Sequence, residues 1–523
     1  MLYLLKRRIR HLIKMIKPVP QCFYDFYKFN SPWWKENTPE TKNAGSILYV
    51  SRTPFPLAMV VNMPVVKKIA EEQHKKIVIG LPYAYNDKQT KLLYGSYGVD
   101  DYMIIDTSPW YMWLYFAYKA LKIIYTKNGV EKLLKLSYKG VSFGEELYDA
   151  IIRMDTNMYT IDKMSIKYIS IIVDAYSNIY NADKAFSNKY DTLVYGDCDY
   201  NMQGWPKMAI HHNRKCFQAN CSGIIDHQEK KENRVFNGGR ITKEIYESES
   251  KKIDARKLEE FLRKRFVGAD KNYLDCCAYY NKKEYSLATM YDVLCVNHRE
   301  RKNVLIAAHA FSDAPHYAYN MIFKDYFTWL FETIKILKES DNVNVFVKEH
   351  PTAYYYGEKG SVAYYVAKYQ MDNVYVLPQD FNTISVFSTM DAVVTCQGTI
   401  GLEATIYGIP VFTAGQGYYY GFGIDNNSDN LEEYIYKMHH ITEYPKPTEH
   451  QIRLAKEVLY LSMKRDEIRP SIIEIQDQSV KMNWLRPDAI IAQCCSINEL
   501  LKEGITPKEN YDNLLKYIKV MHD

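Results

Sequence analysis

One stretch in the second half of the chain constrains the fold more than any other: residues 391–415, DAVVTCQGTIGLEATIYGIPVFTAG. Residues 392–395 form a short β-branched run, which is typical of a buried parallel strand. Residues 397–399 predict a turn, and 401–407 predict a short helix that ends at a glycine. Because 409–413 reads as the next strand, we predict a strand–turn–helix–strand element of an open α/β sheet.

This element predicts a site for an anion. The free backbone N–H groups and the positive dipole end at the start of a helix suit a phosphate. Gln397 and Gly398 lie in the turn, where a glycine lets the backbone approach a ligand closely, and the Thr399 hydroxyl can donate to the same anion. Gly401 begins the helix, and Glu403 is placed where a carboxylate can bind ribose hydroxyls. The alternative is an ordinary α/β turn with an exposed glutamate.

A second strand ends in residues of the same kind. The strand 343–347 runs directly into Lys348, His350 and Pro351. A histidine at the carboxyl end of a parallel strand lies where open α/β sheets bind ligands, and the proline keeps it extended. We therefore predict that Lys348 and His350 face the anion at Gly398. The alternative is a structural histidine.

Further strands predict two sheets. Residues 304–308 should open the second sheet, and His309 and Asp313 follow in a loop that we expect to border the ligand. The alternative for this loop is a helix cap at Ser312 or Asp313. Strands alternate with helices in the first half as well, which predicts another parallel sheet. Its expected strands are 47–50, 76–81, 102–105 and 191–195.

Three carboxylates are candidates for a general base, the group that would take the proton of an acceptor hydroxyl. Glu145 begins a charged helix in the first half, Asp197 follows a strand there, and Asp313 lies beside His309. We rank Glu145 first and Asp313 second, and we keep Asp197 as a rival candidate. The alternative for Glu145 is an acidic helix start, which the helix dipole favours without any catalytic role.

The first seventeen residues, MLYLLKRRIRHLIKMIK, contain six Lys or Arg and no acid. Apolar side chains recur there at helical spacing. This basic amphipathic pattern predicts contact with an anionic membrane surface. The alternative is a helix that docks on the body of the protein.

Composition excludes several classes of protein. A chain of 523 residues exceeds one ordinary core, and a net charge of +5 is too weak for a nucleic-acid binder. The ten cysteines lack the spacing of a metal site, so we predict no metal and no cofactor. We find neither a secretory signal nor an apolar run of about 18 residues, and we expect a cytoplasmic location.

Five motifs resemble known proteins. KEHP and CQGTIGLEA are similar to the donor half of the GT-B glycosyltransferases that build bacterial capsule and other surface polysaccharides. Three further stretches resemble one subgroup of these proteins: KGVSFGEELYDAIIR, VLIAAHAFSDAPH and IFKDYFTWLFETIK. The subgroup usually has Gly-Asp where this chain has Gly144-Glu145, which keeps a carboxylate but puts its catalytic role in doubt.

The resemblance implies an α/β fold of the GT-B type, with two Rossmann-like domains whose parallel sheets face a cleft, plus helical terminal segments. The implied parts are a basic segment (1–35), an acceptor domain (36–295), a nucleotide-sugar domain (296–445) and C-terminal helices (446–523). In the GT-B architecture a C-terminal helix crosses back to the first domain, and by analogy residues 451–463 are its candidate.

The resemblance also implies an activity. The protein would transfer a sugar from a nucleotide donor to a glycan or lipid-linked glycan, without a metal, at the inner face of the cell membrane. The His350-Pro351 motif is similar to that of Kdo transferases, which favours a CMP-sugar donor. The alternatives are a glycerophosphotransferase that uses CDP-glycerol and a non-catalytic partner of a capsule assembly complex. A sugar-nucleotide epimerase is disfavoured, because it gives the N-terminal basic helix no role.

Overall fold

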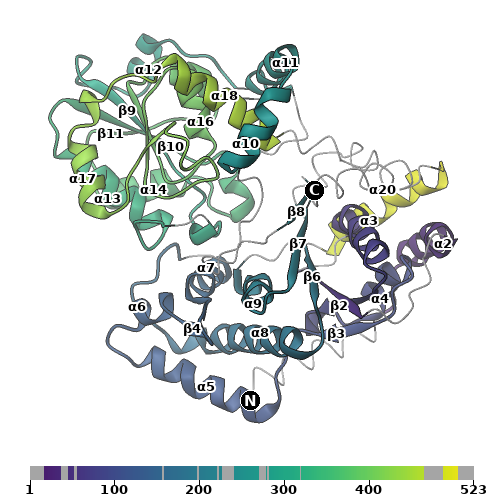
Figure 1. Cartoon of the computed structure of the whole chain (residues 1–523). Helices are drawn as coiled ribbons and strands as arrows, with labels where there is room; N and C mark the ends of the chain where they lie inside the picture. The colour runs from purple at the N-terminus through teal and green to yellow at the C-terminus, as the bar shows by residue number, and fades with distance from the viewer. Residues whose placement is uncertain are drawn as a thin grey trace. The chain divides into compact units, whose positions relative to one another are not determined.

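The protein forms two compact units (Figure 1). The first contains residues 1–151, 162–238 and 465–523, and the second contains 152–161 and 239–464. The computed structural model describes residues 17–36, 45–51, 56–155, 158–196, 200–220, 223–226, 241–269, 278–279, 282–317, 320–463 and 487–504. The N-terminal basic helix expected over residues 1–17 lies outside this set except for Lys17, as does Asp197.

A six-stranded sheet forms the centre of the first unit, in the order β3-β2-β1-β6-β7-β8. All neighbours are parallel except β7 and β8, which pair antiparallel. The strands are β1 (Ser46–Val50), β2 (Lys76–Leu81), β3 (Tyr102–Ile104), β6 (Thr192–Tyr195), β7 (Lys215–Asn220) and β8 (Gly223–Asp226). A short hairpin, β4 (Ser137–Tyr138) and β5 (Val141–Ser142), lies outside this sheet.

Helices cover both faces of the first sheet (Figure 1). One apolar core joins it to α2 (Gln21–Glu36), α3 (Pro56–Glu72), α4 (Lys88–Gly95) and α20 (Pro487–Lys502). The other helices of the unit are α5 (Trp110–Ile124), α6 (Gly129–Leu134), α7 (Gly144–Met154), α8 (Ile169–Asn188) and α9 (Gly204–His211). Of these, α8 packs against α5 and α9.

The second unit contains a wholly parallel sheet in the order β11-β10-β9-β12-β13-β14. Its strands are β9 (Lys302–Ala307), β10 (Val343–Lys348), β11 (Val374–Val376), β12 (Ala392–Thr395), β13 (Val411–Thr413) and β14 (Asn426–Asn427). In β9, Val304 and Ile306 enter one apolar core and Leu305 enters the other, as expected for a strand that is buried on both faces. In both units the strand order corresponds to 3-2-1-4-5-6, that of a Rossmann fold.

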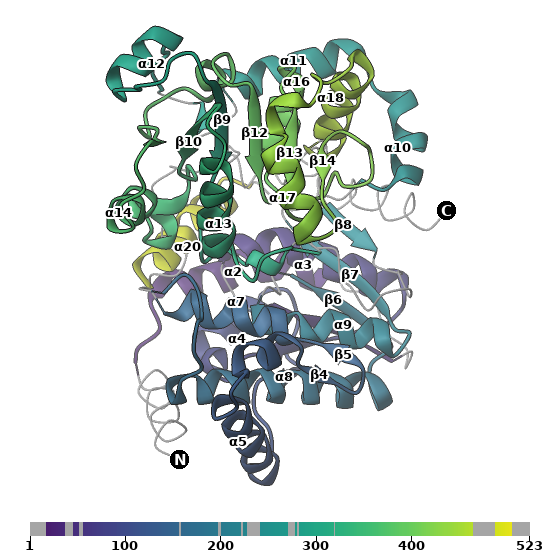
Figure 2. The same ribbon diagram turned by 90° about the vertical axis from the view of Figure 1, so that its left-hand side faces the viewer.

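Figure 2 shows α13 (Tyr326–Lys338) and α17 (Leu431–His439) in front of the second sheet. Asp325 begins α13, because its carboxylate accepts a hydrogen bond from the Thr328 amide at 2.6 Å. The remaining helices of the unit are α10 (Lys243–Glu249), α11 (Ala255–Phe266), α12 (Leu287–Val293), α14 (Ser361–Lys368), α15 (Thr383–Phe387), α16 (Ile400–Ile406) and α18 (Glu449–Met463).

The expected α/β fold with two Rossmann-like units is confirmed, but two boundaries differ from expectation. Residues 239–295 belong to the second unit, because α10 and α11 pack on α18. The helix over residues 451–463, which was the candidate to cross back, also stays in the second unit, where it packs on α16. It is α20 that joins the first unit, against α2 and α3.

Candidate functional site

The strand order of the second sheet indicates where a ligand would bind. The chain leaves β9 toward β10 and leaves β12 toward β13, in opposite directions, so the switch point of the sheet lies at the carboxyl ends of β9 and β12, where open α/β sheets bind ligands. His309 follows β9, Gln397 follows β12, and His350 follows β10 beside β9. The sequence therefore placed these residues correctly at strand ends, but β10 and β12 are not neighbours, because β9 lies between them.

Hydrogen bonds join His309, which follows β9, to the end of β12. The Gln397 amide donates to His309 Nε2 at 3.3 Å, and Thr395 Oγ1 lies 3.2 Å from the same atom. Because a backbone N–H can only donate, Nε2 is the acceptor and the ring proton is on Nδ1. Gly398 allows this contact, since a Cβ there would lie 3.5 Å from His309 Cε1 and 3.0 Å from Thr395 Oγ1.

Aromatic rings surround His309. Its ring stacks on Tyr326, with 4.2 Å between centroids, and lies nearly parallel to the His350 ring at 6.3 Å. The Gln397 side-chain amide in turn donates to the Tyr326 hydroxyl. Burial first, and the neighbouring His350 second, lower the pKa of His309 from 6.5 to about 3. His309 is therefore neutral at neutral pH and acts as a fixed dipole at this edge.

His350 has the opposite tautomer. The Thr352 amide donates to its Nδ1 at 3.3 Å, and the Thr352 hydroxyl lies 2.8 Å from that atom. The neutral ring therefore carries its proton on Nε2, so that nitrogen is a hydrogen-bond donor, which suits a phosphate oxygen. Pro351 is half-buried and follows in the turn that leads into a short 3₁₀ helix, Ala353–Tyr356.

Lys348 differs from expectation. Its side chain is buried, and Nζ donates to the Phe381 carbonyl at 3.0 Å. This contact holds the ammonium within the fold rather than at the tip of the strand. The next residue, Glu349, is also committed to structure, because its carboxylate accepts the amides of Gly360 and Val362 at the start of α14.

The turn before α16 is partly as expected. Thr399 stands at the N-cap position, and its side chain makes no cap hydrogen bond. The amide of Gly401 donates to the Gly398 carbonyl at 2.9 Å, so it serves the turn itself. A Cβ at Gly401 would lie only 2.1 Å from the Tyr419 hydroxyl, which also donates to Gly398 O. Gly401 thus has a packing role in place of the expected phosphate contact.

Glu403 is neither exposed nor placed simply for a ribose. Its side chain is 6% exposed and that of Arg265, from α11, is 2% exposed. The guanidinium contacts Glu403 Oε1 through two nitrogens, at 2.7 and 2.8 Å. The alternative of an exposed glutamate is therefore wrong, and the ribose interpretation has to account for a carboxylate that already forms a buried ion pair.

The three candidate bases fall in different places. Glu145 is exposed in the first turn of α7, in the first unit. Asp313 is half-buried in the loop that carries His309, in the second unit. Asp197 lies outside the described residues. Of the three, the structure places only Asp313 on the same loop as His309.

Glu358 was missed by the sequence analysis. Its buried carboxylate accepts the amides of Phe311 and Ser312, at 2.6 and 2.8 Å, and the Ser312 hydroxyl at 2.5 Å. Burial raises its pKa despite these donors. Glu358 thereby fixes the loop that carries His309 and Asp313. The only signal in the sequence was the pair of glycines near it, Gly357 and Gly360, which indicates a turn. In the structure both glycines have positive φ.

The corresponding edge of the first sheet lies between β1 and β6. Gly196 donates to Val50 O at 2.8 Å, and a Cβ there would lie 2.9 Å from Asn62 Nδ2. Asn62 Nδ2 donates to the Tyr49 hydroxyl at 3.1 Å, whereas its Oδ1 is buried and has no partner in the described part of the chain. A hydroxyl donor from a ligand would satisfy this oxygen.

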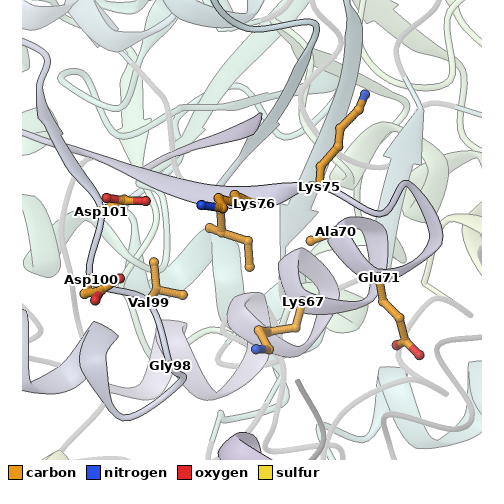
Figure 3. Close-up of a pocket in the computed structure, with 10 residues that line it drawn as sticks. Lys67, Ala70, Glu71, Lys75, Lys76, Gly98, Val99, Asp100 and Asp101 are labelled. Carbon is orange, nitrogen blue, oxygen red and sulfur yellow. The ribbon is translucent and has the colours of Figure 1, made fainter. Parts of the chain in front are cut away.

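Figure 3 shows a pocket of about 210 Å³ elsewhere in the first unit. Lys67, from α3, and Lys76, at the start of β2, line it together with Asp100 and Asp101. Burial lowers the pKa of Lys67 to about 8. Because the pocket lies where β2 begins, it is at the sheet edge opposite to the one where α/β folds bind ligands.

Comparison with known proteins finds one family model that matches part of the chain. Residues 219–465 match the model of a family described as capsule polysaccharide biosynthesis protein. This match includes β9 to β14 and confirms the resemblance over that segment. No protein with a curated description matches the chain.

Several solved structures match the chain at low sequence identity and low TM-score. A β-Kdo 2,4-transferase, KpsC of Thermosulfurimonas dismutans, is 15% identical over 52% of this chain and 79% of that one, with a TM-score of 0.29. UDP-GlcNAc 2-epimerase of Neisseria meningitidis is 11% identical over 81% and 98%, with a TM-score of 0.25. HepE of Anabaena, in complex with UDP-glucose, is 12% identical over 88% and 99%, with a TM-score of 0.25.

Proposed function

We propose that this chain, whose residues 219–465 match the capsule polysaccharide biosynthesis family, is a glycosyltransferase that builds a bacterial surface polysaccharide, capsule or lipopolysaccharide, from a nucleotide-activated sugar. One observation carries the proposal. Within the matched segment, His309, His350 and the turn at Gln397 converge at the switch point of a Rossmann-type sheet. Ligands bind at this position in open α/β sheets.

The donor phosphate would meet two hydrogen-bond donors at this edge, and a third group would hold the turn beside them. The His350 Nε2–H can donate to a phosphate oxygen, and the Thr399 hydroxyl stands at the start of α16. His309 is neutral, so its part is to hold the turn of Gln397 in place through the bond to that amide. Because Lys348 is committed to Phe381 O, the proposed neutralisation of the phosphate falls to hydrogen-bond donors rather than to a lysine.

The reaction would follow ordinary glycosyl transfer. The acceptor hydroxyl oxygen forms a bond to the anomeric carbon, the bond from that carbon to the donor phosphate oxygen breaks, and the hydroxyl proton passes to a carboxylate. Glu145 and Asp313 are the two described candidates. Glu358 fixes the loop that carries both His309 and Asp313, which supports the candidacy of Asp313 without excluding Glu145.

The remaining features of the proposal concern the partners. We propose a CMP-sugar as the donor class, with no cofactor or metal, and a glycan or lipid-linked glycan as the acceptor. The edge at Asn62 Oδ1 is the proposed place for an acceptor hydroxyl. A peripheral position at the inner face of the cell membrane accords with the acceptor and with the basic residues 1–17. Among the described helices, none is long and apolar enough to cross a membrane.

A ligand screen tests this proposal. The melting temperature is measured with CMP, CDP, UDP, GDP and their sugars, for the parent and for His350→Ala. A ligand at a hundred times its dissociation constant adds about 2.7 kcal/mol of stability. We expect a rise with cytidine nucleotides in the parent and a smaller rise in the variant.

Slow hydrolysis of the donor without an acceptor, followed by nucleotide release, separates an enzyme from a non-catalytic partner. Hydrolysis of CDP-glycerol but of no nucleotide-sugar would replace the proposal with a glycerophosphotransferase. A parent that no nucleotide stabilises would refute the donor site.

A further inference from the structure

Helix α5 is apolar on two sides. Its inner side packs on α8, with Phe116 stacked on Tyr176 at 5.3 Å and Ala117, Ala120 and Ile123 also buried. The outer side carries large exposed side chains: Trp110 (76% exposed), Tyr111 (54%), Leu114 (54%), Tyr115 (47%) and Tyr118 (62%), followed by Tyr125 (78%) just beyond the helix. A surface helix normally has a polar outer side, so this aromatic face calls for a partner.

The charges in and next to this helix are predominantly positive. Helix α5 contains two lysines and no acid, and the stretch 110–139 contains six lysines and one acid, Glu131. Lys119 lies over the rings of Tyr115 and Tyr176, at 4.9 and 5.4 Å, so its stem runs along the aromatic surface. Lys122 is exposed on the last turn of the helix. Lys139 alone among the six forms an ion pair, with Asp183, in the described part of the chain.

We propose that the outer face of α5, defined as Trp110, Tyr111, Leu114, Tyr115, Tyr118 and Tyr125 with Lys119 and Lys122, docks on the surface of an anionic lipid bilayer. Trp and Tyr concentrate where a bilayer meets water, because one end of each ring system is apolar and the other is polar. Lysine stems lie along such a surface while the ammonium groups reach anionic headgroups. Aromatic rings and lysines together thus match this partner in both polarity and charge.

The aromatic face consists of residues 110–125 and includes no residue of the basic segment 1–17. It belongs to the described first unit, where α5 lies beside α8 in both views (Figures 1 and 2). The proposal is also independent of the donor site, which lies in the second unit. Nucleotide-induced stabilisation therefore remains as a separate readout in every variant below.

Co-sedimentation with vesicles tests the proposal. The full chain is mixed with vesicles of phosphatidylcholine alone or with 30% phosphatidylglycerol (a chosen composition). Trp110→Ser/Tyr118→Ser removes two exposed rings, and each ring should contribute about tenfold or more to partitioning. Lys119→Gln/Lys122→Gln removes the two charges of this face at about fivefold each. The matched control is Tyr364→Ser/Tyr436→Ser, which removes two rings of 60% and 59% exposure from the second unit.

We expect the parent and the control to bind anionic vesicles alike, and both α5 variants to bind at least tenfold more weakly. Trp110→Phe keeps an apolar ring, so it should still bind while losing part of the fluorescence quenching by brominated lipid. Equal binding by the α5 variants and the control would overturn the proposal. So would equal binding to neutral and anionic vesicles, or a loss of self-association in the variants with unchanged vesicle binding, which would assign the face to a second copy of the chain.

Discussion

Replacing Glu403 with glutamine distinguishes a structural ion pair from a ribose-binding carboxylate. The exposed fractions of Arg265 and Glu403 are 2% and 6%, so neither charge is well solvated once its partner is lost. Removing one partner of such a pair costs about 3–5 kcal/mol, because an uncompensated charge stays buried. For a unit of this size, 1 kcal/mol shifts the melting temperature by about 2–4 °C. We therefore expect the second unit of Glu403→Gln to melt about 6–20 °C lower.

Differential scanning calorimetry is the suitable assay, because a chain of two units can melt in two transitions. The double variant Arg265→Met/Glu403→Leu replaces the pair with apolar side chains and should recover most of the loss. The control, Glu260→Gln, breaks a pair with Lys264 on the same helix α11, where the exposed fractions are 55% and 51%. Because both side chains are solvated, that change should leave the melting temperature close to that of the parent.

The ribose interpretation makes the opposite prediction. If Glu403→Gln melts with the parent but binds nucleotide at least tenfold more weakly by calorimetry at 25 °C, then the carboxylate serves the ligand and the structural reasoning is wrong. If the double variant melts as low as the single one, an uncompensated buried charge does not explain the loss of stability.

Three other predictions follow from the site. His309 has a folded pKa of about 3 and an unfolded value near 6.5, so only the unfolded chain takes up a proton between these values. Its contribution to the free energy of unfolding is therefore complete above pH 6.5 and falls by about 2 kcal/mol by pH 5. Urea unfolding at pH 7 and pH 5 should show a smaller fall for His309→Gln than for the parent. An equal fall would contradict the lowered pKa of His309. His350→Ala and Thr399→Ala should each weaken nucleotide binding by about 1.5–3 kcal/mol in titration calorimetry at unchanged melting temperature, and donor binding like that of the parent in both would show that the donor site is elsewhere. Glu145→Gln or Asp313→Asn, whichever removes the base, should keep nucleotide binding and lose turnover by about 10²–10⁴-fold in a transfer assay; a loss below tenfold in one variant assigns its residue to structure and leaves the other as the base.

The local elements of the fold were predictable because their signal lies within a few residues. The expected strand over 392–395 coincides with β12, and the expected strand over 76–81 coincides with β2. The helix predicted from Gly401 begins one residue earlier, at Ile400. Periodicity reports which side of an element is buried, so it locates strands and helices well.

The same signal does not report what an element is buried against. Arg265 and Glu403 are 138 positions apart, and Ser312 and Glu358 are 46 apart. Neither pair has a local pattern, so Glu403 was expected to face a ribose and Glu358 was overlooked. Lys348 illustrates the same limit, since its partner is a carbonyl from a distant loop. The strand-end residues of the site were predictable, whereas the contacts that fix them were not.

The chain passes from the first unit to the second and back, which affects the order in which the two units can fold during translation. The first unit is completed by α20, whose Cys494, Ile497 and Leu500 enter the same core as α2 and α3. All of the second unit, residues 152–161 and 239–464, leaves the ribosome before this helix does. The second unit can therefore finish folding while the first still exposes the apolar surface of α2. During translation that surface is prone to aggregation until α20 covers it, which makes it a candidate for chaperone binding.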